Sequence, residues 1–288
     1  MASLIFGCGY LGMRVAERWL ASGEKVFAVT RREVRAAELC RRGIEPIVAD
    51  VTDAKSLAEL PVADKILFAV GFDRAAGRSI HEVYVSGLRN VLDALPPQSP
   101  RIVYISSTGV YGQNDGSWVD EESPCEPQRD GGRACLAAEH LLSGHSRGAD
   151  ATVLRLAGIY GPDRSPRIAD LRAGLPIPGP SERCLNLIHV DDAANIIVAA
   201  AEPAGEFRTF TVSDGQSVVC CDYFAYLAKL VAAPPPVFDE ENSTVANRGR
   251  GGGSKRVRNQ RMIRELGVSL QYPSYREGLA AIVEDSID

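Results

Sequence analysis

Residues 3–29 read SLIFGCGYLGMRVAERWLASGEKVFAV, and they set the architecture of the N-terminal half of the chain. An apolar run at 3–6 leads into glycines at 7, 9 and 12, and apolar residues at helical spacing follow. Gly23 ends the helical pattern, and a second apolar run occupies 25–29. Apolar runs without polar alternation are typical of strands covered on both faces. The segment therefore predicts a strand, a helix and a second strand parallel to the first.

The same alternation continues along the chain. The segment SIHEVYVSGLRNVLDAL (79–95) has apolar residues at helical spacing and ends before Pro96 and Pro97, so it predicts a long helix. Strands that alternate with helices indicate right-handed βαβ units and hence a doubly wound parallel sheet, an α/β fold. Further apolar runs, predicted as strands, lie at 45–48, 65–70, 101–106 and 151–157.

Composition excludes several classes of partner. The 288 residues are 45% hydrophobic and 24% charged, with a formal net charge of −5, which is ordinary for a globular protein. This charge offers no attraction to nucleic acid or an anionic membrane, and no apolar run reaches the roughly 18 residues of a membrane span. Seven cysteines without metal-ligand spacing predict a reduced, cytoplasmic protein with no metal site.

The turn GCGYLG (7–12) has the spacing of a dinucleotide-binding loop. Gly7 permits a tight turn, Gly9 lets the backbone approach a pyrophosphate, and Gly12 lets the helix pack closely on the strand. The pyrophosphate would meet the N–H groups at the start of the helix, around Tyr10 and Leu11. The alternative is a glycine-rich turn without a ligand.

The end of the second strand predicts which dinucleotide binds. An acid that accepts from the ribose 2′-hydroxyl of NAD is expected there, but the chain reads VTRRE (29–33), with Thr30, Arg31 and Arg32. A guanidinium can hold a 2′-phosphate through two hydrogen bonds. NADP is therefore favoured over NAD. Alternatively, both arginines are solvated charges that open the next helix.

Two further strand ends complete the predicted cofactor site. Asp50 follows the third strand, where a carboxylate can meet the amino group of adenine. Ala69, Val70 and Gly71 follow the fourth strand and would let the cofactor lie against the backbone.

Seven motifs in order carry a family resemblance across essentially the whole chain. They are GCGYLG, VADVTD (48–53), YISSTGVYG (104–112), ESPCEP (122–127), LRLAGIYGP (154–162), NLIHVDDAA (186–194) and FTVSDG (210–215). With these motifs the chain resembles the extended short-chain dehydrogenases/reductases, the NAD(P)-dependent epimerase/dehydratase family, and in particular its atypical members. The resemblance implies a Rossmann domain with a smaller C-terminal substrate lobe.

The resemblance also implies roles for single residues. Ser107 matches the family's catalytic Ser/Thr. Asp50 and Val51 match the pair that contacts adenine. Leu156 and Ala157 match the backbone that lines the nicotinamide.

By the same resemblance, the segment around 188–215 rejoins the nucleotide domain. The cofactor domain would then comprise 1–163 with 188–215, and the substrate lobe 164–187 with 216–288. The first of the lobe segments is rich in proline, glycine and charge, as expected of a segment that covers a substrate.

The chain departs from the family at its Tyr-x-x-x-Lys pair. If Glu139 is the family's Glu four residues after the lysine, Cys135 stands at the lysine and Gly131 at the tyrosine. The tyrosine serves as general acid/base and the lysine lowers its pKa, so neither substitute can take over these roles. Thr108 and Gly109 stand where the dehydratases have Asp-Glu, so dehydration by that route is not expected.

Five side chains are candidates to replace the lost acid/base, and each has a structural role that suits it better. The candidates are Tyr84, Tyr111, Tyr160, Cys135 and His189. Thr108, Tyr111 and Arg133 are the candidate substrate contacts.

Two functions follow as hypotheses. The first is an NAD(P)-dependent oxidoreductase or epimerase-like enzyme on a polar small molecule, for example a nucleotide-linked sugar, with Ser107 polarising the reacting oxygen. The second is a non-catalytic NAD(P)-binding sensor or scaffold. Under either, a homodimer is a candidate assembly.

Overall fold

The computed structural model describes residues 1–97, 101–164, 167–203, 205–240 and 254–285. The chain folds into two compact units: Met1–Val110, Pro127–Arg155 and Ala194–Phe210 form the first, and Tyr111–Glu126, Leu156–Ala193 and Thr211–Asp288 the second. The sequence predicts a division of the chain by function. The predicted cofactor domain (1–163 with 188–215) and substrate lobe (164–187 with 216–288) stay predictions.

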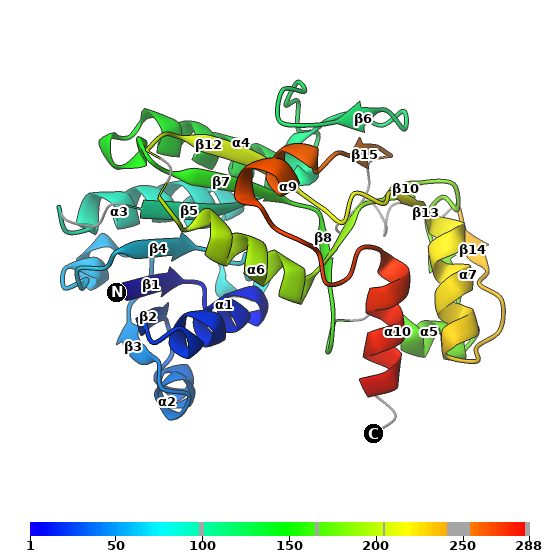
Figure 1. Cartoon of the computed structure of the whole chain (residues 1–288), viewed down its shortest axis with the longest axis horizontal. Helices are drawn as coiled ribbons and strands as arrows, with labels where there is room; N and C mark the ends of the chain where they lie inside the picture. Colours follow the sequence, from blue (N-terminus) through cyan, green and yellow to red (C-terminus); the bar gives the residue numbers. More distant parts are fainter. Residues whose placement is uncertain (98–100, 165–166, 204, 241–253, 286–288) are drawn as a thin grey trace. The chain divides into compact units, whose positions relative to one another are not determined.

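A seven-stranded sheet at the centre of the first unit confirms the predicted doubly wound α/β fold (Figure 1). Its strands are β1 (Ala2–Phe6), β2 (Lys25–Thr30), β3 (Glu45–Val48), β4 (Lys65–Phe68), β5 (Arg101–Ser107), β7 (Thr152–Leu156) and β12 (Arg208–Val212). They lie in the order β12-β7-β5-β4-β1-β2-β3. The pairs β1–β2, β1–β4, β2–β3 and β4–β5 are parallel.

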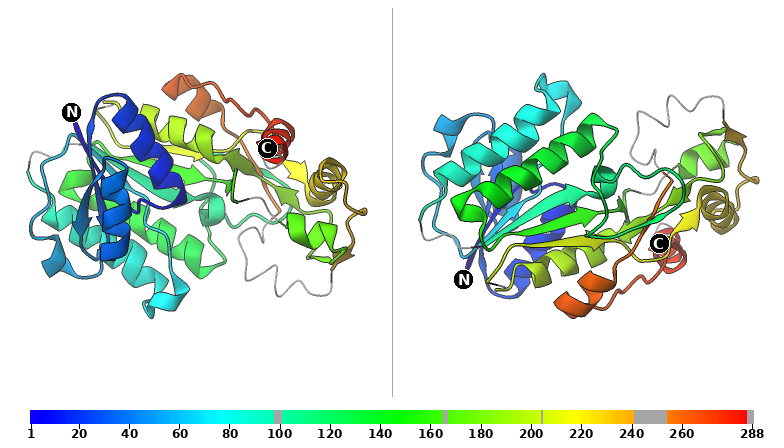
Figure 2. Two further views of the ribbon diagram at one scale, coloured as in Figure 1. Left: turned by 90° about the horizontal axis from the view of Figure 1, so that it is seen from below. Right: turned by 90° about the horizontal axis from the view of Figure 1, so that it is seen from above.

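Helices cover both faces of this sheet, which explains the unbroken apolar runs. α1 and α6 lie on one face and α3 and α4 on the other (Figure 2). The α-helices are α1 (Tyr10–Ala21), α2 (Glu33–Arg41), α3 (Gly87–Ala94), α4 (Asp130–Gly144) and α6 (Val190–Ala200). Short 3₁₀ turns are η1 (Ala54–Leu57), η2 (Arg74–Ala76), η4 (Thr108–Val110) and η5 (Ser146–Gly148). Leu4, Ile5 and Leu67 of the central strands are wholly buried between these layers.

The strand order reverses between β1 and β4. From β1 the chain builds outward through β2 to β3, and from β4 it builds the other way through β5. In such sheets ligands bind outside the carboxyl ends of the strands at the reversal point. The residues that follow β1, β2, β3 and β4 therefore frame the expected cofactor position, within the first unit.

The predicted helix at 79–95 contains a π-turn, η3 (Glu82–Ser86), directly before α3. Gly87 begins α3 at the point where the helix passes close to the end of β3. A Cβ at Gly87 would lie 2.9 Å from Cγ2 of Val51. π-turns are frequent at functional sites, and this one directly precedes the helix start that packs against Val51, a predicted cofactor residue.

The second unit has its own apolar core and short strand pairs. Tyr160, Tyr223, Leu227 and Leu279 belong to this core. Its helices are α5 (Ile168–Arg172), α7 (Cys220–Leu230), α9 (Gln260–Leu266) and α10 (Tyr275–Asp285). Its strands are β6 (Trp118–Val119), β8 (Gly158–Tyr160), β9 (Ile177–Pro178), β10 (Cys184–Leu185), β11 (Leu187–His189), β13 (Val218–Val219), β14 (Phe238–Asp239) and β15 (Arg256–Val257).

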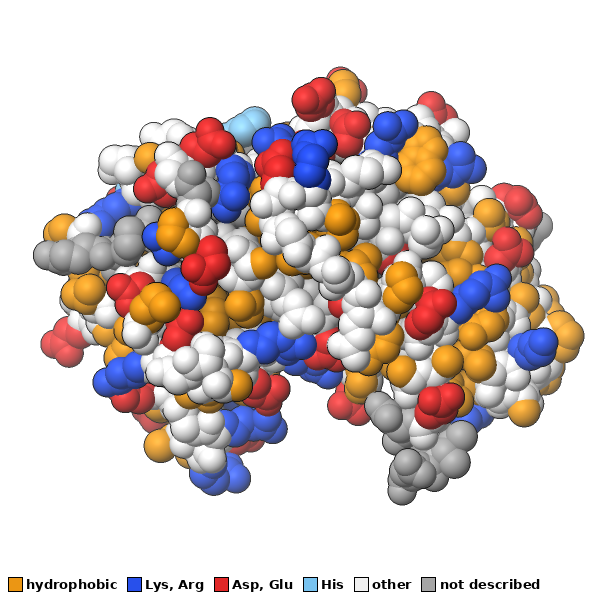
Figure 3. Space-filling view, viewed as in Figure 1, with side chains coloured by type: hydrophobic (Ala, Val, Ile, Leu, Met, Phe, Trp, Pro, Cys, Tyr) orange, Lys and Arg blue, Asp and Glu red, His pale blue; other side chains and the backbone are white. Residues whose placement is uncertain are grey.

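On the face shown in Figure 3, acidic and basic side chains are interspersed. In the described part of the chain, no helix is both long and apolar enough to cross a membrane.

Candidate functional site

The three glycines of GCGYLG differ in what surrounds them. Gly7 has φ +95°, and a Cβ there would lie 2.4 Å from the carbonyl oxygen of Ala69. A Cβ at Gly12 would lie 2.4 Å from the carbonyl oxygen of Gly7, so neither position has room for a side chain. A Cβ at Gly9, in contrast, would meet nothing within 4 Å. Gly7 and Gly12 thus shape the turn, and Gly9 borders open space.

This open space lies at the N-terminus of α1. Gly9 occupies the N-cap position, and no side chain caps the helix. The first N–H groups of a helix have no partner within the helix, and the positive end of the helix dipole lies there. The turn therefore fits an anionic group such as a pyrophosphate. Tyr10 and Leu11 are the first helical residues, and their predicted contact with a pyrophosphate stays a prediction.

Arginine side chains surround the end of β2. Arg31 Nη2 donates to Asp73 Oδ2 at 3.2 Å, which links the end of β2 to the loop after β4. Arg35 Nη2 donates to the carbonyl oxygen of Cys8, inside the glycine turn, at 3.1 Å. Arg32 is exposed at the N-cap position of α2. The sequence predicts Arg31 and Arg32 as cofactor residues, whereas Arg35 is not among the predicted residues. Arg35 lies in α2, and its position in the sequence does not indicate a contact with Cys8.

The ends of β3 and β4 are ordered by local hydrogen bonds. Asp50 Oδ1 accepts from the backbone N–H of Thr52 at 2.9 Å and from its hydroxyl at 2.8 Å. The carbonyl oxygen of Val51 accepts from Asn90 Nδ2 at 2.9 Å. Ala69 N–H donates to the carbonyl oxygen of Phe6 at 2.7 Å, which continues the β1–β4 pairing to the glycine turn.

Val70 is half-buried and Gly71 is exposed directly after Ala69. A Cβ at Gly71 would meet nothing within 4 Å. The predicted cofactor residues after β1, β2, β3 and β4 thus lie at one edge of the sheet, and their roles stay predictions.

Ser107 is the last residue of β5, and its side chain is held by the following turn. Its Oγ accepts from the N–H of Gly109 at 3.0 Å. The hydroxyl proton can therefore still be donated to a ligand oxygen. Ser107 and Thr108 are half-buried, and Gly132 at the start of α4 packs against the carbonyl oxygen of Gly109.

Helix α4 is continuous through Gly131 and Cys135, where the sequence predicts that the family's pair is replaced. Gly131 lies in its first turn, and a Cβ there would touch only Ile80 Cδ1, at 3.7 Å. Cys135 is buried next to Tyr104 and Ser106. Burial, together with the nearby Glu139 carboxylate, raises the pKa of the Cys135 thiol to about 12. This thiol is protonated at neutral pH and is no nucleophile.

A buried ion pair lies on the same helix. Glu139 Oε2 accepts from Arg155 Nη2 at 2.7 Å, and both side chains are at least nine-tenths buried. Glu139 Oε1 also accepts from the hydroxyl of Ser106 at 2.5 Å. Together the ion pair and the Ser106 hydrogen bond join α4 to β7 and β5.

The remaining candidates have structural surroundings. Arg133 forms an exposed ion pair with Asp130 at 3.1 Å. Tyr84 lies in the π-turn η3, half-buried. Gly131, which is predicted to stand at the position of the family's tyrosine, carries no side chain, and that alignment stays a prediction.

Candidates of the second unit are embedded in its interior. Tyr111 is 3% exposed, and its carbonyl oxygen accepts from Lys255 Nζ at 3.2 Å. His189 is buried, with its ring centroid 3.8 Å from that of Tyr272. Ala157 N–H donates to the carbonyl oxygen of Val212 at 2.8 Å, and Leu156 is the last residue of β7.

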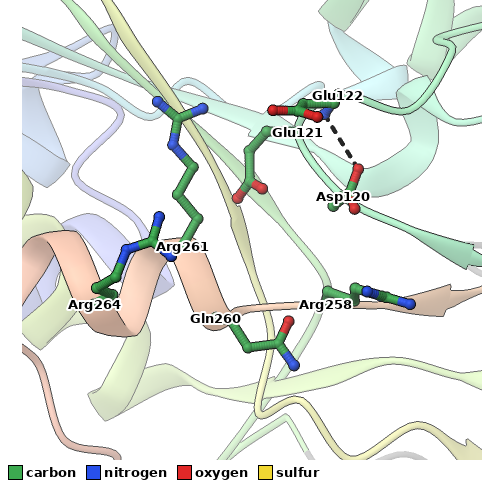
Figure 4. Close-up of a pocket in the computed structure, with 7 residues that line it drawn as sticks. All are labelled: Asp120, Glu121, Glu122, Arg258, Gln260, Arg261 and Arg264. Atoms are coloured by element: carbon green, nitrogen blue, oxygen red, sulfur yellow. Dashed lines mark hydrogen bonds between the residues drawn. The ribbon is translucent and has the colours of Figure 1, made fainter.

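The second unit also contains a small charged pocket of about 210 Å³ (Figure 4). Acidic residues line one side and arginines of the segment around α9 line the other. The lining residues are Asp120, Glu121, Glu122, Arg258, Gln260, Arg261 and Arg264, and none of them is a predicted site residue.

Comparison with known proteins places this geometry in a family. Protein YeeZ of Escherichia coli strain K12 is 29% identical over 277 residues, which cover 93% of this chain and 95% of YeeZ. The solved structure of a conserved protein of unknown function from Silicibacter pomeroyi is 30% identical, with a TM-score of 0.81 over 99% of each chain. UDP-glucose 4-epimerase of Thermotoga maritima, solved with UDP-glucose, shares the fold at 19% identity, with a TM-score of 0.82 over 100% of each chain.

A model of the NAD dependent epimerase/dehydratase family matches residues 4–212. This match runs from the first strand through the glycine turn, the Ser107 turn and α4 to the last strand of the central sheet. It covers well over half of the chain. The chain therefore belongs to the NAD dependent epimerase/dehydratase family.

Proposed function

We propose that the first unit binds NADP(H) in preference to NAD(H). The observation that carries this proposal is the open space beside Gly9 at the uncapped start of α1. The arginines after β2 support a phosphorylated ribose, because a guanidinium suits a phosphate dianion. The family's description as NAD dependent supports a pyridine nucleotide in general.

The predicted cofactor residues of the first unit have the following roles in this proposal. The N–H groups around Tyr10 and Leu11 bind the pyrophosphate, and Arg31 and Arg32 bind the 2′-phosphate. Asp50 and Val51 bind the adenine. Ala69, Val70 and Gly71 form the wall along which the cofactor lies.

The protein acts, in this proposal, as an oxidoreductase or epimerase-like enzyme on a polar small molecule such as a nucleotide-linked sugar. The bound nicotinamide supplies a reversible hydride acceptor. Ser107 donates a hydrogen bond to the reacting oxygen of the substrate, because its Oγ is oriented by the N–H of Gly109. Thr108 and Arg133 contact the substrate in this proposal.

One observation favours a second function. Gly131 carries no proton to exchange, and Cys135 is a buried thiol with a raised pKa. A protein with this helix and an intact cofactor site would serve as a non-catalytic NAD(P)-binding sensor or scaffold. Both functions require the same cofactor site.

Two measurements separate these functions. Calorimetric titration of the purified chain with NADP⁺ and NAD⁺ tests the cofactor site, and failure to bind either would refute both functions. Single-turnover hydride transfer with a panel of sugar nucleotides then tests catalysis. Hydride transfer between the cofactor and a sugar nucleotide would support the enzymatic function. Tight cofactor binding without hydride transfer to any member of the panel would support the non-catalytic function.

A further inference from the structure

The two residues that directly follow β2 include no acid, but the fold brings a carboxylate from another loop into contact with Arg31. Asp73 comes from the loop after β4, and its Oδ2 accepts from Arg31 Nη2 at 3.2 Å. The two side chains are 52% and 47% exposed. In NAD-binding proteins the acid that accepts from the ribose 2′-hydroxyl lies near the end of the second strand, the strand that Arg31 follows here.

The Asp73 carboxylate is oriented by the backbone and not only by Arg31. Its Oδ1 accepts from the N–H of Ala75 at 3.0 Å and so caps the short turn η2. Gly77, with φ +68°, ends that turn. One carboxylate oxygen is thus held by the loop, and the other is presented to the end of β2.

The other arginines nearby are not equivalent to Arg31. Arg35 is held by the carbonyl oxygen of Cys8 and by Glu38, whose Oε2 accepts from Arg35 Nη1 at 2.7 Å. Arg35 therefore braces the glycine turn. Arg31 is the guanidinium whose described partner is a single exposed carboxylate, and such exposed pairs are weak enough for a phosphate to replace.

We propose that Asp73 reduces the preference of the protein for NADP(H) over NAD(H). This inference rests on the proposed cofactor site. With NADP(H), the 2′-phosphate displaces Asp73 from Arg31, so the carboxylate competes with the cofactor for the guanidinium. With NAD(H), the same carboxylate accepts from the ribose hydroxyl. Asp73 therefore weakens the binding of NADP(H) and strengthens the binding of NAD(H). It thus reduces the preference for NADP(H) that Arg31 creates.

The variant Asp73→Asn tests this role while keeping the turn. Asparagine caps helical turns as well as aspartate, so the Ala75 hydrogen bond is retained. Calorimetric titration at one ionic strength should show NADP⁺ binding tightened by about fivefold, the scale of one exposed ion pair. NAD⁺ binding should weaken by about tenfold, since a charged acceptor is lost.

Glu45→Gln is the matched control. Glu45 is an exposed carboxylate paired with Lys25 at 2.9 Å, on the same unit but at the start of β3, away from the carboxyl ends. Its neutralisation should change both affinities by less than about twofold if only specific contacts matter. If Glu45→Gln and Asp73→Asn changed the two cofactor affinities equally, the effect would come from net charge alone, and the inference would be overturned.

A second variant tests whether Asp73 acts through Arg31. In an Arg31→Ala background, Asp73→Asn should no longer tighten NADP⁺ binding. An undiminished gain in that background would overturn the competition. If the wild-type chain binds cofactor but Asp73→Asn leaves both affinities unchanged, the inference fails and the proposed function stands. If wild type binds neither cofactor, the proposed function fails first.

Discussion

The backbone of Gly132 in α4 meets the carbonyl oxygen of Gly109 so closely that a Cβ on Gly132 would lie 2.1 Å from that oxygen. The same Cβ would lie 2.9 Å from Cβ of Pro127. This contact seats the start of α4 on the turn that follows Ser107. It is the reason for a glycine here, in a helix where glycine is otherwise unfavourable.

Gly132→Ala should therefore destabilise the fold and disturb Ser107. The added methyl group must push α4 away from the turn, at a cost of about 1–3 kcal/mol or more. Gly144→Ala is the matched control in the same helix, because a Cβ there would meet nothing within 4 Å. We expect Gly144→Ala to be neutral or slightly stabilising. Urea unfolding of both variants checks this, and equal midpoints would contradict the close contact.

Gly9→Val should abolish dinucleotide binding while leaving the fold intact. The side chain would enter the open space beside Gly9, where the pyrophosphate is proposed to lie. Gly7→Ala should instead destabilise the protein, since its Cβ would overlap the backbone of Ala69. Circular dichroism reports the fold and calorimetry the binding. Unchanged NADP⁺ affinity in a folded Gly9→Val variant would show that the glycine turn has only a structural role.

Ser107→Ala should lower the rate of single-turnover hydride transfer. If Gly131 replaces the family's tyrosine, as the sequence predicts, the wild-type rate should already be slow. Loss of the Ser107 hydrogen-bond donor should then reduce it by about 10²-fold. Tyr111→Phe is the comparison, because it removes one hydroxyl group from a side chain that is buried in the second unit. We expect it to leave the rate nearly unchanged. Equal rates for wild type and Ser107→Ala would favour the sensor.

Stability should fall as pH rises toward 8 because of Asp214. Burial raises the pKa of this carboxyl from 3.8 to about 8, with Asp192 and Glu277 adding repulsion. Its Oδ2 is buried without a hydrogen-bond partner among the described residues. The folded state therefore holds a proton that the unfolded state releases. This contribution to stability is fully present below about pH 4 and is lost as pH rises to about 8.

Asp214→Asn should flatten this dependence. The slope for one group is at most about 1.4 kcal/mol per pH unit, measured as the free energy of unfolding in urea between pH 5 and 8. Glu206→Gln, which neutralises an exposed carboxylate, should keep the wild-type slope. A wild-type slope that persists in Asp214→Asn would mean that other groups control the pH dependence.

The central sheet and the glycine turn could be predicted from the sequence because their signals are local. Apolar runs at 3–6, 25–29 and 45–48 correspond to β1, β2 and β3 within a residue at each end. Burial on both faces imposes such runs, and a tight turn imposes glycine at position 7, where φ is positive. The family motifs added Ser107, which the structure places at the end of β5.

Other relationships depended on the tertiary structure. Asp73 lies beside Arg31, 42 residues away in sequence, because β4 and β2 flank the same strand and end at the same edge. Gly132 lies in α4 directly against the carbonyl oxygen of Gly109, a contact between residues 23 positions apart that periodicity does not indicate. Asp214 has an ordinary sequence context, and its raised pKa comes from burial. Periodicity and spacing describe neighbours along one element, whereas these contacts join elements whose approach is set by packing of the whole unit.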